Sequence, residues 1–307
     1  MKNLSVYLLL LLVAISWGSE WVVVKNLTGE ISFILIATGR FVLAALIFLP
    51  VAAWLYLKGE RVEKRDIPEL ILFGIFGAAL TYILQDSGIS MTKAINSSLM
   101  VTFNPAMTLL LSAFFLKERV DAKKTIALSI AFLGAFLVIT NGDMNIETKM
   151  NDILGSLLVL ASTFCWAIYT IISKNFVKRH SPIFITAYSS ILGALMLIPV
   201  AFLTSSPSKF LTLSLYSFAG LLYLAVVCVA FCYSAWSYAL ERIEASKTAV
   251  FTYLIPFFTA IFACIFLGES ITPISAFGGL LIFLGVYYST TGTVSESIKD
   301  RLTNTLP

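Results

Sequence analysis

The sequence predicts an all-α integral membrane protein whose ten transmembrane helices form two inverted five-helix repeats around a central cavity. Three observations predict this fold class. Apolar residues make up 59% of the 307 residues and charged residues only 12%, where a soluble domain carries about 25% charged residues. The apolar residues fall into ten long runs, and the first five runs are similar to the last five. So few charges cannot cover a water-facing surface, which excludes a soluble enzyme, a disordered chain and a nucleic-acid-binding protein.

The length of the apolar runs indicates their structure. A transmembrane helix needs about 20 mostly apolar residues, and a helix satisfies its own backbone hydrogen bonds in lipid. Barrel strands would instead alternate polar and apolar residues over about ten positions, and these runs are longer and uniformly apolar. The predicted helices cover roughly residues 5–24, 32–57, 67–89, 94–116, 123–140, 152–173, 181–203, 212–239, 246–267 and 272–291.

The first run has features of a secretory signal. Lys2 precedes an apolar core, and Ala14-Ile15-Ser16 resembles a cleavage site. We interpret the run as a membrane helix instead, because the segment that follows the supposed cleavage site recurs later in the chain.

The positive charges indicate how the helices are oriented. With the N-terminus placed inside, 16 Lys and Arg residues fall in inside loops or the tail, and four fall in outside loops. Because cytoplasmic loops are enriched in Lys and Arg, we expect a multi-pass protein of the inner cell membrane with both termini in the cytoplasm. The same rule explains the basic loops without a nucleic-acid or lipid-specific site.

The two halves of the chain are similar to each other. At an offset of 149 residues, twelve positions between 17 and 52 are identical, including Trp17 with Trp166 and Lys25 with Lys174. Further along, an offset of 151 residues pairs Pro105 with Pro256 and the Phe-Leu-Gly that begins at 132 with the one at 283. Each copy holds five predicted helices, and an odd number inverts the second copy relative to the first. Inverted repeats are typical of transporters that open alternately to either side.

These repeats divide the chain into four parts. Residues 1–140 form the first five-helix repeat, and residues 152–294 form the second. The polar stretch 141–151 is the predicted outside linker, and residues 295–307 are the predicted cytoplasmic tail.

Short motifs in both halves resemble one known family. The first half contains Trp17-Gly18-Ser19, Arg40-Phe41 and Asn104-Pro105, and the second half contains Ile255-Pro256 and Leu267-Gly268-Glu269. In order and spacing, the chain resembles the EamA type of the drug/metabolite transporter superfamily. This resemblance implies two inverted five-helix units, a central cavity, and export of amino acids or other small metabolites. Two positions depart from it: Ile255 stands where the family often has an acidic residue, and Glu20 where it often has a neutral one.

Three charged residues lie clearly within apolar runs. Glu20 and Arg40 fall about five and nine residues from the outer ends of the first two helices, roughly 8 and 13 Å deep at ~1.5 Å per residue. Because a charge in hydrocarbon is costly, it usually faces a partner or water. Glu20 and Arg40 could bind the two ends of a zwitterion, Glu20 could cycle a proton, or the two could form a purely structural ion pair. Asp86 lies nearer the outer surface, where we expect water to solvate it.

The fourth and ninth helices each contain a proline. Ser97, Asn104 and Thr108 share one helical face by their spacing, and Pro105 loosens the helix beside Asn104. Transporters place substrate contacts at such breaks near the midplane, so Asn104 is a candidate substrate ligand. Pro256 repeats the break in the second half. The alternative is a simple kink satisfied by Ser or Thr side chains.

Aromatic and amide side chains complete the set of candidate substrate contacts. Tyr82 and Gln85 lie one turn apart on the third helix, Trp236 aligns with Gln85 in the second half, and Tyr169 lies on the sixth helix. In a cavity these side chains would stack on apolar or cationic groups. The alternatives are core packing or an aromatic belt at the membrane surface.

The sequence contains no pattern typical of catalysis or metal binding. The four cysteines form no CxxC pair, and His180, the single histidine, lies in an inside loop without nearby ligands in sequence. No phosphate-binding loop or nucleophile motif occurs. We therefore expect neither an enzyme nor a bound cofactor or metal. The expected partners are a small-molecule substrate, the lipid bilayer and, through Glu20, a coupled proton, and the oligomeric state stays open.

These observations suggest three candidate functions. The first is a secondary transporter that exports amino acids or similar small metabolites by alternating access. The second is an exporter of cationic amphiphilic drugs, in which Glu20 between Trp17 and Trp21 binds the cation. The third is an intramembrane enzyme or a sensor, which would need a catalytic dyad or a large soluble appendage, and the sequence contains neither.

Overall fold

The computed structural model describes residues 3–91, 94–118, 120, 122–140, 150–267, 273, 274 and 276–288. Within these residues the chain is entirely helical, with no β-strand. The predicted linker 141–151 lies almost wholly outside the described residues, as does the predicted tail 295–307.

Two long helices open the chain, and the segments that follow are interrupted. The elements of residues 3–140 are α1 (Leu4–Leu27), α2 (Phe33–Leu57), the 3₁₀ turn η1 (Lys64–Asp66), α3 (Ile67–Gly74), the π-helical η2 (Ile75–Ala79), α4 (Leu80–Met91), α5 (Ala94–Val101), α6 (Asn104–Leu111), the π-helical η3 (Ser112–Leu116) and α7 (Ala122–Thr140).

The rest of the chain has the same pattern. Its elements are α8 (Met150–Phe176), α9 (Pro182–Thr204), the 3₁₀ turn η4 (Pro207–Thr212), α10 (Leu215–Tyr223), the π-helical η5 (Leu224–Phe231), α11 (Cys232–Arg242), α12 (Ala245–Ala249), the 3₁₀ turn η6 (Val250–Tyr253) and α13 (Leu254–Leu267), followed by a helix over Ala276–Tyr288.

The helices of the described residues differ in length from the predicted runs. Seven are long and apolar enough to cross a membrane. The other three predicted runs contain shorter apolar helices, Asn104–Leu116, Thr125–Gly134 and Ala276–Tyr288. The run 94–116 is shortened because its helix is interrupted between Val101 and Asn104, where Pro105 lacks the N–H that a continuous helix needs.

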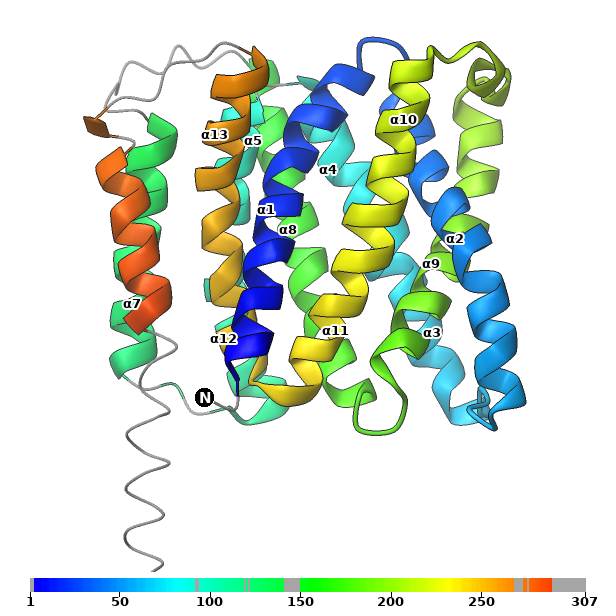
Figure 1. Cartoon of the computed structure of the whole chain (residues 1–307), viewed down its shortest axis with the longest axis horizontal. Coiled ribbons are helices and arrows are strands. Elements are labelled where there is room, and N and C mark those ends of the chain that lie inside the picture. The colour runs from blue at the N-terminus through cyan, green and yellow to red at the C-terminus, as the bar shows by residue number, and fades with distance from the viewer. Residues whose placement is uncertain are drawn as a thin grey trace, which may run out of the picture.

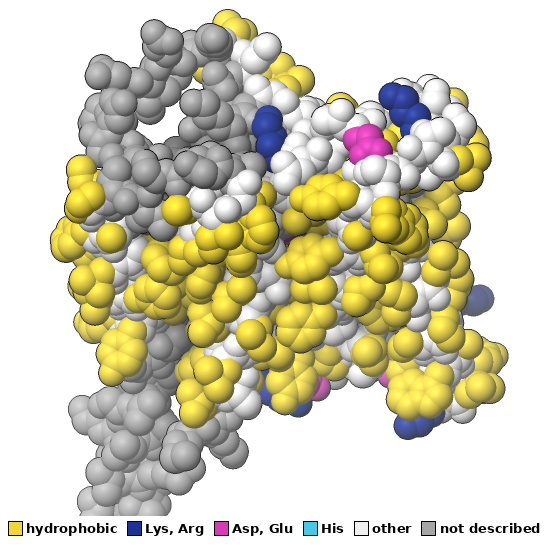
Figure 2. Space-filling view, turned by 45° about the horizontal axis from the view of Figure 1, so that its top comes forward, with side chains coloured by type: hydrophobic (Ala, Val, Ile, Leu, Met, Phe, Trp, Pro, Cys, Tyr) yellow, Lys and Arg dark blue, Asp and Glu magenta, His cyan; other side chains and the backbone are white. Residues whose placement is uncertain are grey.

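The helices stand side by side as a bundle (Figure 1), in which α1, α4, α8 and α11 surround the centre. We call the end of the bundle where α1 begins the N-side, and the end where α1 finishes the opposite side. Apolar side chains cover the flank of the bundle between its two ends, and the charged side chains visible in Figure 2 lie near those ends. Leu57, Phe202 and Leu203 are among the most exposed apolar residues, which suits a flank in contact with lipid.

Candidate functional site

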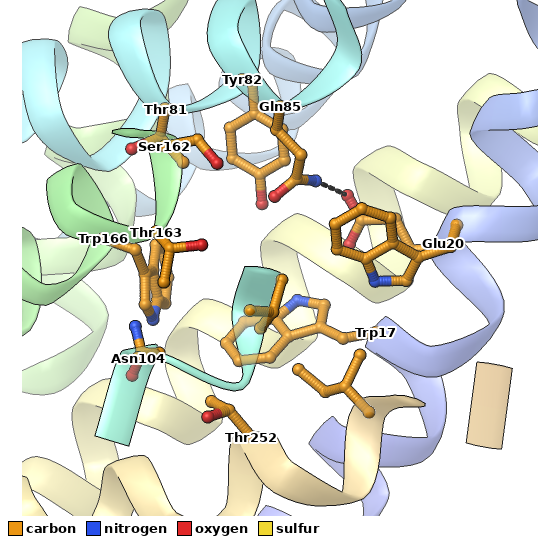
Figure 3. A pocket seen from close by; sticks show the side chains of 13 residues that line it. Trp17, Glu20, Thr81, Tyr82, Gln85, Asn104, Ser162, Thr163, Trp166 and Thr252 are labelled. Atoms are coloured by element: carbon orange, nitrogen blue, oxygen red, sulfur yellow. Dashed lines mark hydrogen bonds between the residues drawn. The ribbon is translucent and has the colours of Figure 1, made fainter. Parts of the chain in front are cut away.

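A pocket lies in the centre of the bundle, where α1, α4, α8 and the two proline-containing segments meet. Its cavity volume is about 50 Å³. Figure 3 shows the labelled side chains pointing into it from several helices. The lining residues are Trp17, Glu20, Trp21, Thr81, Tyr82, Gln85, Val101, Asn104, Ser162, Thr163, Trp166, Thr252 and Ile255.

Among the described residues of this lining, Glu20 is the only charged side chain, and it belongs to a buried triad. The Arg40 guanidinium donates Nη1 to Glu20 Oε1 and Nη2 to Asp86 Oδ2, the latter at 3.0 Å. The Arg40 guanidinium also lies over the ring of Tyr82, 4.4 Å from its centroid. Gln85 Nε2 donates to Glu20 Oε1 at 3.3 Å, which orients the carboxylate that borders the pocket.

The triad brings two carboxyl groups and one guanidinium into the bundle. Arg40 and Asp86 are 0% exposed and Glu20 is 3% exposed, so each charge depends on its partners rather than on water. The expectation that water solvates Asp86 is wrong, because α4 turns its side chain toward α2, where Arg40 neutralises it. Two carboxyl groups therefore share one guanidinium beside the pocket.

Aromatic rings form the wall of the pocket around Trp17. The Trp17 ring lies 5.2 Å from that of Trp166 and 5.3 Å from that of Trp236, measured between centroids. Trp17 Nε1 donates to the carbonyl oxygen of Cys228 at 3.1 Å, and Trp236 Nε1 donates to Thr170 Oγ1 at 3.3 Å. Because both indoles are held by packing and a hydrogen bond, this wall has a fixed shape.

The interruption between α5 and α6 places Asn104 in the pocket. Asn104 begins α6, and Pro105 follows as the second residue of that helix. Thr108 Oγ1 donates to Asn104 Oδ1 at 3.3 Å, so the amide nitrogen is the group that is free to point toward a ligand. Pro256 is the counterpart of Pro105 at the offset of 151 residues and lies in the first turn of α13. This helix directly follows the 3₁₀ turn η6, which contains Thr252.

The structure separates the predicted site residues into two groups. Glu20, Tyr82, Gln85 and Asn104 line the pocket. Arg40, Tyr169 and Trp236 are at most 1% exposed and lie behind the lining.

Sequence reasoning missed the hydroxyl side chains of the pocket. Thr81, Ser162, Thr163 and Thr252 line it, and no spacing in the sequence distinguishes them from the many other Ser and Thr residues of these helices. Such hydroxyls commonly bond to the carbonyl one turn earlier, as Thr163 Oγ1 does to Val159 O at 2.9 Å. Only the tertiary arrangement reveals that they face a common space.

Polar contacts join segments that are distant in sequence at both ends of the bundle. On the N-side, Arg179 pairs with Glu69 at 2.7 Å, which raises the pKa of Arg179. His180 contacts Asp66 through Nε2 at 2.9 Å, a partner that is distant in the sequence.

The matching contact on the opposite side involves Glu30, between α1 and α2. Glu30 accepts hydrogen bonds from the backbone N–H of Ser214 at 2.7 Å and from the Ser217 hydroxyl. These hydrogen bonds, from Ser217 first, lower the pKa of Glu30, and they cap the start of α10.

No group of three or more His, Cys, Asp or Glu side chains within the described ranges could hold a metal ion. The described residues that line the pocket offer a carboxylate, aromatic faces, amides and hydroxyls, which are groups that can recognise a ligand.

A family model matches the chain twice, over residues 4–140 and 153–291. The chain belongs to the EamA-like transporter family. It is therefore a multi-pass membrane protein of a transporter family, and the resemblance inferred from the short motifs is confirmed.

Curated relatives cover almost the whole chain. An uncharacterized transporter, YyaM, of Bacillus subtilis (strain 168) is 29% identical over 93% of each chain. A probable terminal-alkyne amino-acid exporter of Streptantibioticus cattleyicolor is 25% identical over 90% of each chain. A probable amino-acid metabolite efflux pump of Salmonella typhimurium is 27% identical, over 92% of this chain and 94% of the relative.

A solved crystal structure has the same fold. It superposes with a TM-score of 0.74 at 16% sequence identity, and the match covers 93% of this chain and 96% of that chain. At this identity the likeness concerns the fold alone.

Proposed function

We propose that this protein is a secondary active transporter that exports amino acids or similar small metabolites by alternating access. The observation that carries this proposal is the central pocket, in which one carboxylate, Glu20, faces aromatic, amide and hydroxyl side chains. Two relatives named as a probable amino-acid exporter and a probable amino-acid metabolite efflux pump support the substrate class.

The proposed architecture is ten transmembrane helices in two inverted five-helix repeats. One pair of contacts at opposite ends of the bundle supports it. Lys25, at the end of α1, donates to Ile89 O at 3.0 Å, and Lys174, at the end of α8, donates to Leu240 O at 2.5 Å. The offset of 149 residues pairs Lys25 with Lys174, and the offset of 151 residues pairs Ile89 with Leu240. The same lysine–carbonyl contact therefore occurs once in each half, at opposite ends of the bundle.

The repeats divide the chain as the sequence predicts, at residues 1–140 and 152–294, with a linker at 141–151 and a tail at 295–307. The two family matches support this division. The distribution of Lys and Arg supports an inner-membrane protein with both termini in the cytoplasm, where the N-side faces the cytoplasm.

In the proposed mechanism, Glu20 binds the amino group of the substrate. A carboxylate and an ammonium form a charge-assisted hydrogen bond, which is strong where water is excluded. The amide of Asn104 is the donor available for a substrate carboxylate. The hydroxyls of Thr163 and Thr252 already donate to the carbonyls of Val159 and Ala249, so they can accept a hydrogen bond from the substrate. Arg40 neutralises one carboxylate and holds Glu20 in place, while Tyr169 and Trp236 support the aromatic wall from behind.

The breaks before Pro105 and Pro256 provide the flexibility that alternating access needs. Each proline removes a helical hydrogen bond beside the pocket, so the adjoining segments can change their angle when the two repeats rock. Protonation of Glu20 would release the amino group, which allows an inward proton to drive export.

Transport in proteoliposomes tests this function. We expect counterflow of at least one amino acid in a panel of labelled amino acids, sugars and nucleosides, and faster net movement under a pH gradient. If none of the panel exchanges, the metabolite function is wrong. If exchange occurs but ignores the pH gradient, the proton coupling is wrong while the transport function stands.

One observation favours a second candidate function, export of cationic amphiphilic compounds. Three tryptophans, Trp17, Trp21 and Trp166, line the pocket beside Glu20, and the described residues of the lining include no positive charge that could bind a substrate carboxylate. Aromatic faces with a carboxylate are suited to a large organic cation.

The Glu20→Gln variant separates the two functions. We expect it to weaken binding of amino-bearing metabolites by about tenfold or more, since hydrogen bonds to charged groups contribute about 1.5–3 kcal/mol. Glu63→Gln is the control, because Glu63 is 57% exposed and pairs with Arg65 outside the pocket. Loss of resistance to cationic dyes with unchanged amino-acid export would support the drug-export function instead.

A further inference from the structure

Five hydroxyl groups lie buried among α8, α9 and α11, outside the lining of the central pocket. They belong to Tyr169, Ser173, Ser189, Ser190 and Ser237, each 0% exposed. The Tyr169 hydroxyl faces those of Ser173, Ser189 and Ser237, yet none of the five forms a hydrogen bond of ordinary length with the described part of the chain. We call Tyr169, Ser173, Ser189 and Ser237 the hydroxyl cluster.

Unpartnered hydroxyls in a membrane interior are energetically unfavourable. Buried polar groups almost always have a partner, and lipid offers none. The hydroxyl groups come from three helices, and each of them adds its own free-energy cost of burial without a partner. A small polar guest that contacts several of the oxygens would remove it.

The position of the hydroxyl cluster in the repeat indicates what this guest is. The offset of 149 residues pairs Glu20 with Tyr169 and Arg40 with Ser189, and the offset of 151 pairs Asp86 with Ser237. The hydroxyl cluster is therefore the second half's counterpart of the charged triad. In the triad, the positive guanidinium of Arg40 lies between its neighbours. In the second half, a short serine replaces that arginine.

We infer that the hydroxyl cluster binds a small monovalent cation, Na⁺, at the place that corresponds to the guanidinium. Hard oxygen donors suit such an ion, and a set of neutral oxygens suits a single charge, as in the carbonyl sites of ion channels.

Two features of the surroundings favour a cation over a water molecule. Ser173 and Ser237 lie within the last turns of α8 and α11, which end at Phe176 and Arg242, and the C-terminal ends of helices attract positive charge. In addition, the corresponding place in the first half of the chain holds a cationic group, the guanidinium of Arg40. The ammonium of Lys174, next to Ser173 in the chain, would repel a bound cation. This ammonium is already bonded to Leu240 O and Ile243 O.

Thermal melting of the purified full chain in detergent tests the inference. At equal ionic strength, we expect NaCl to raise the melting temperature above its value in choline chloride, with a saturable dependence on Na⁺, because a ligand that binds only the folded state stabilises it. Tyr169→Phe removes one ligand oxygen while keeping the ring, and Ser189→Ala removes another. Each should raise the half-saturating Na⁺ concentration by about tenfold or more.

Ser234→Ala is the matched control. Ser234 lies on α11 like Ser237, but its hydroxyl bonds to the carbonyl of Ala230 at 2.7 Å, so its Na⁺ response should equal that of the unmodified protein. Direct binding of radioactive Na⁺ to the purified protein gives a second measurement that does not depend on how stable the variants are.

Two results would overturn the inference. Equal melting in NaCl and choline chloride, with no bound radioactive Na⁺, would mean that the hydroxyl cluster holds water only. An equal Na⁺ response in Tyr169→Phe, Ser189→Ala and Ser234→Ala would place the ion elsewhere. The inference rests on the proposed two-repeat architecture, but both measurements use no substrate, so failure of the transport function would leave them unaffected.

Discussion

Arg40 is the residue on which the charged centre of the bundle depends. Its guanidinium contacts Glu20 and Asp86, and it is fully buried. An ion pair in a protein interior gains little net free energy, but removal of one partner leaves an uncompensated charge. Arg40 therefore permits two carboxylates inside the membrane, one of which, Glu20, borders the pocket.

Replacement of this arginine should be far more harmful than neutralisation of the whole triad. We expect Arg40→Met to destabilise the protein by about 3–5 kcal/mol, because two buried carboxylates lose their counter-charge. The triple variant Arg40→Met, Glu20→Gln, Asp86→Asn should regain most of that stability. Thermal melting in detergent measures both, and a triple variant no more stable than Arg40→Met would show that charge burial is not the cause.

At the scale of elements, helices α1 and α13 approach closely because α1 has a glycine at the contact. A Cβ built on Gly18 would lie 2.5 Å from Phe258 Cβ and 3.2 Å from the carbonyl oxygen of Ile255. Thr259 Oγ1 also donates to Gly18 O at 2.9 Å. This packing holds the segment after Pro256 against α1 one turn below Trp21, so it sets the distance across the pocket.

A methyl group at this contact should force the two helices apart. We expect Gly18→Ala to cost about 1–3 kcal/mol of stability, the usual range for overpacking, and to reduce transport. Gly220→Ala on α10 is the control, since its Cβ would lie 3.4 Å from Leu27 Cδ2, an ordinary contact. Melting curves that are the same for Gly18→Ala and Gly220→Ala would contradict the importance of this packing.

For the whole molecule, the proposed inversion of the two repeats predicts where equivalent loops lie. The turn after α1 and the turn after α8 are at opposite ends of the bundle, as Figure 1 shows. The native cysteines Cys165, Cys228 and Cys232 are buried and Cys264 is partly buried, so a new surface cysteine should dominate labelling.

Labelling of intact cells with a membrane-impermeant maleimide tests the orientation. We expect Gly29→Cys to react from outside the cell and Lys178→Cys to react only after the membrane is made permeable. The unmodified protein gives the background from its native cysteines. Reaction of both variants from the same side would exclude inverted repeats.

The sequence by itself determined the membrane class, the helical runs and the family. Hydropathy and charge act locally, because each segment of about 20 residues has its own free energy of transfer into lipid, and the motifs around Trp17, Pro105 and Pro256 are contiguous. The same local argument found Glu20 and Asn104, whose polar groups are conspicuous in apolar surroundings.

Only the tertiary structure decided which of these groups share a space. Whether Asp86 is solvated or paired depends on which helix its side chain faces. The packing of α4 against α2 places Asp86 beside Arg40. The hydroxyls of Thr163 and Thr252, and those of Tyr169 and Ser237, are ordinary residues in the sequence and converge only when α8, α11 and α13 pack. Contacts between distant segments depend on helix packing and rotation, which no local pattern of hydrophobicity specifies.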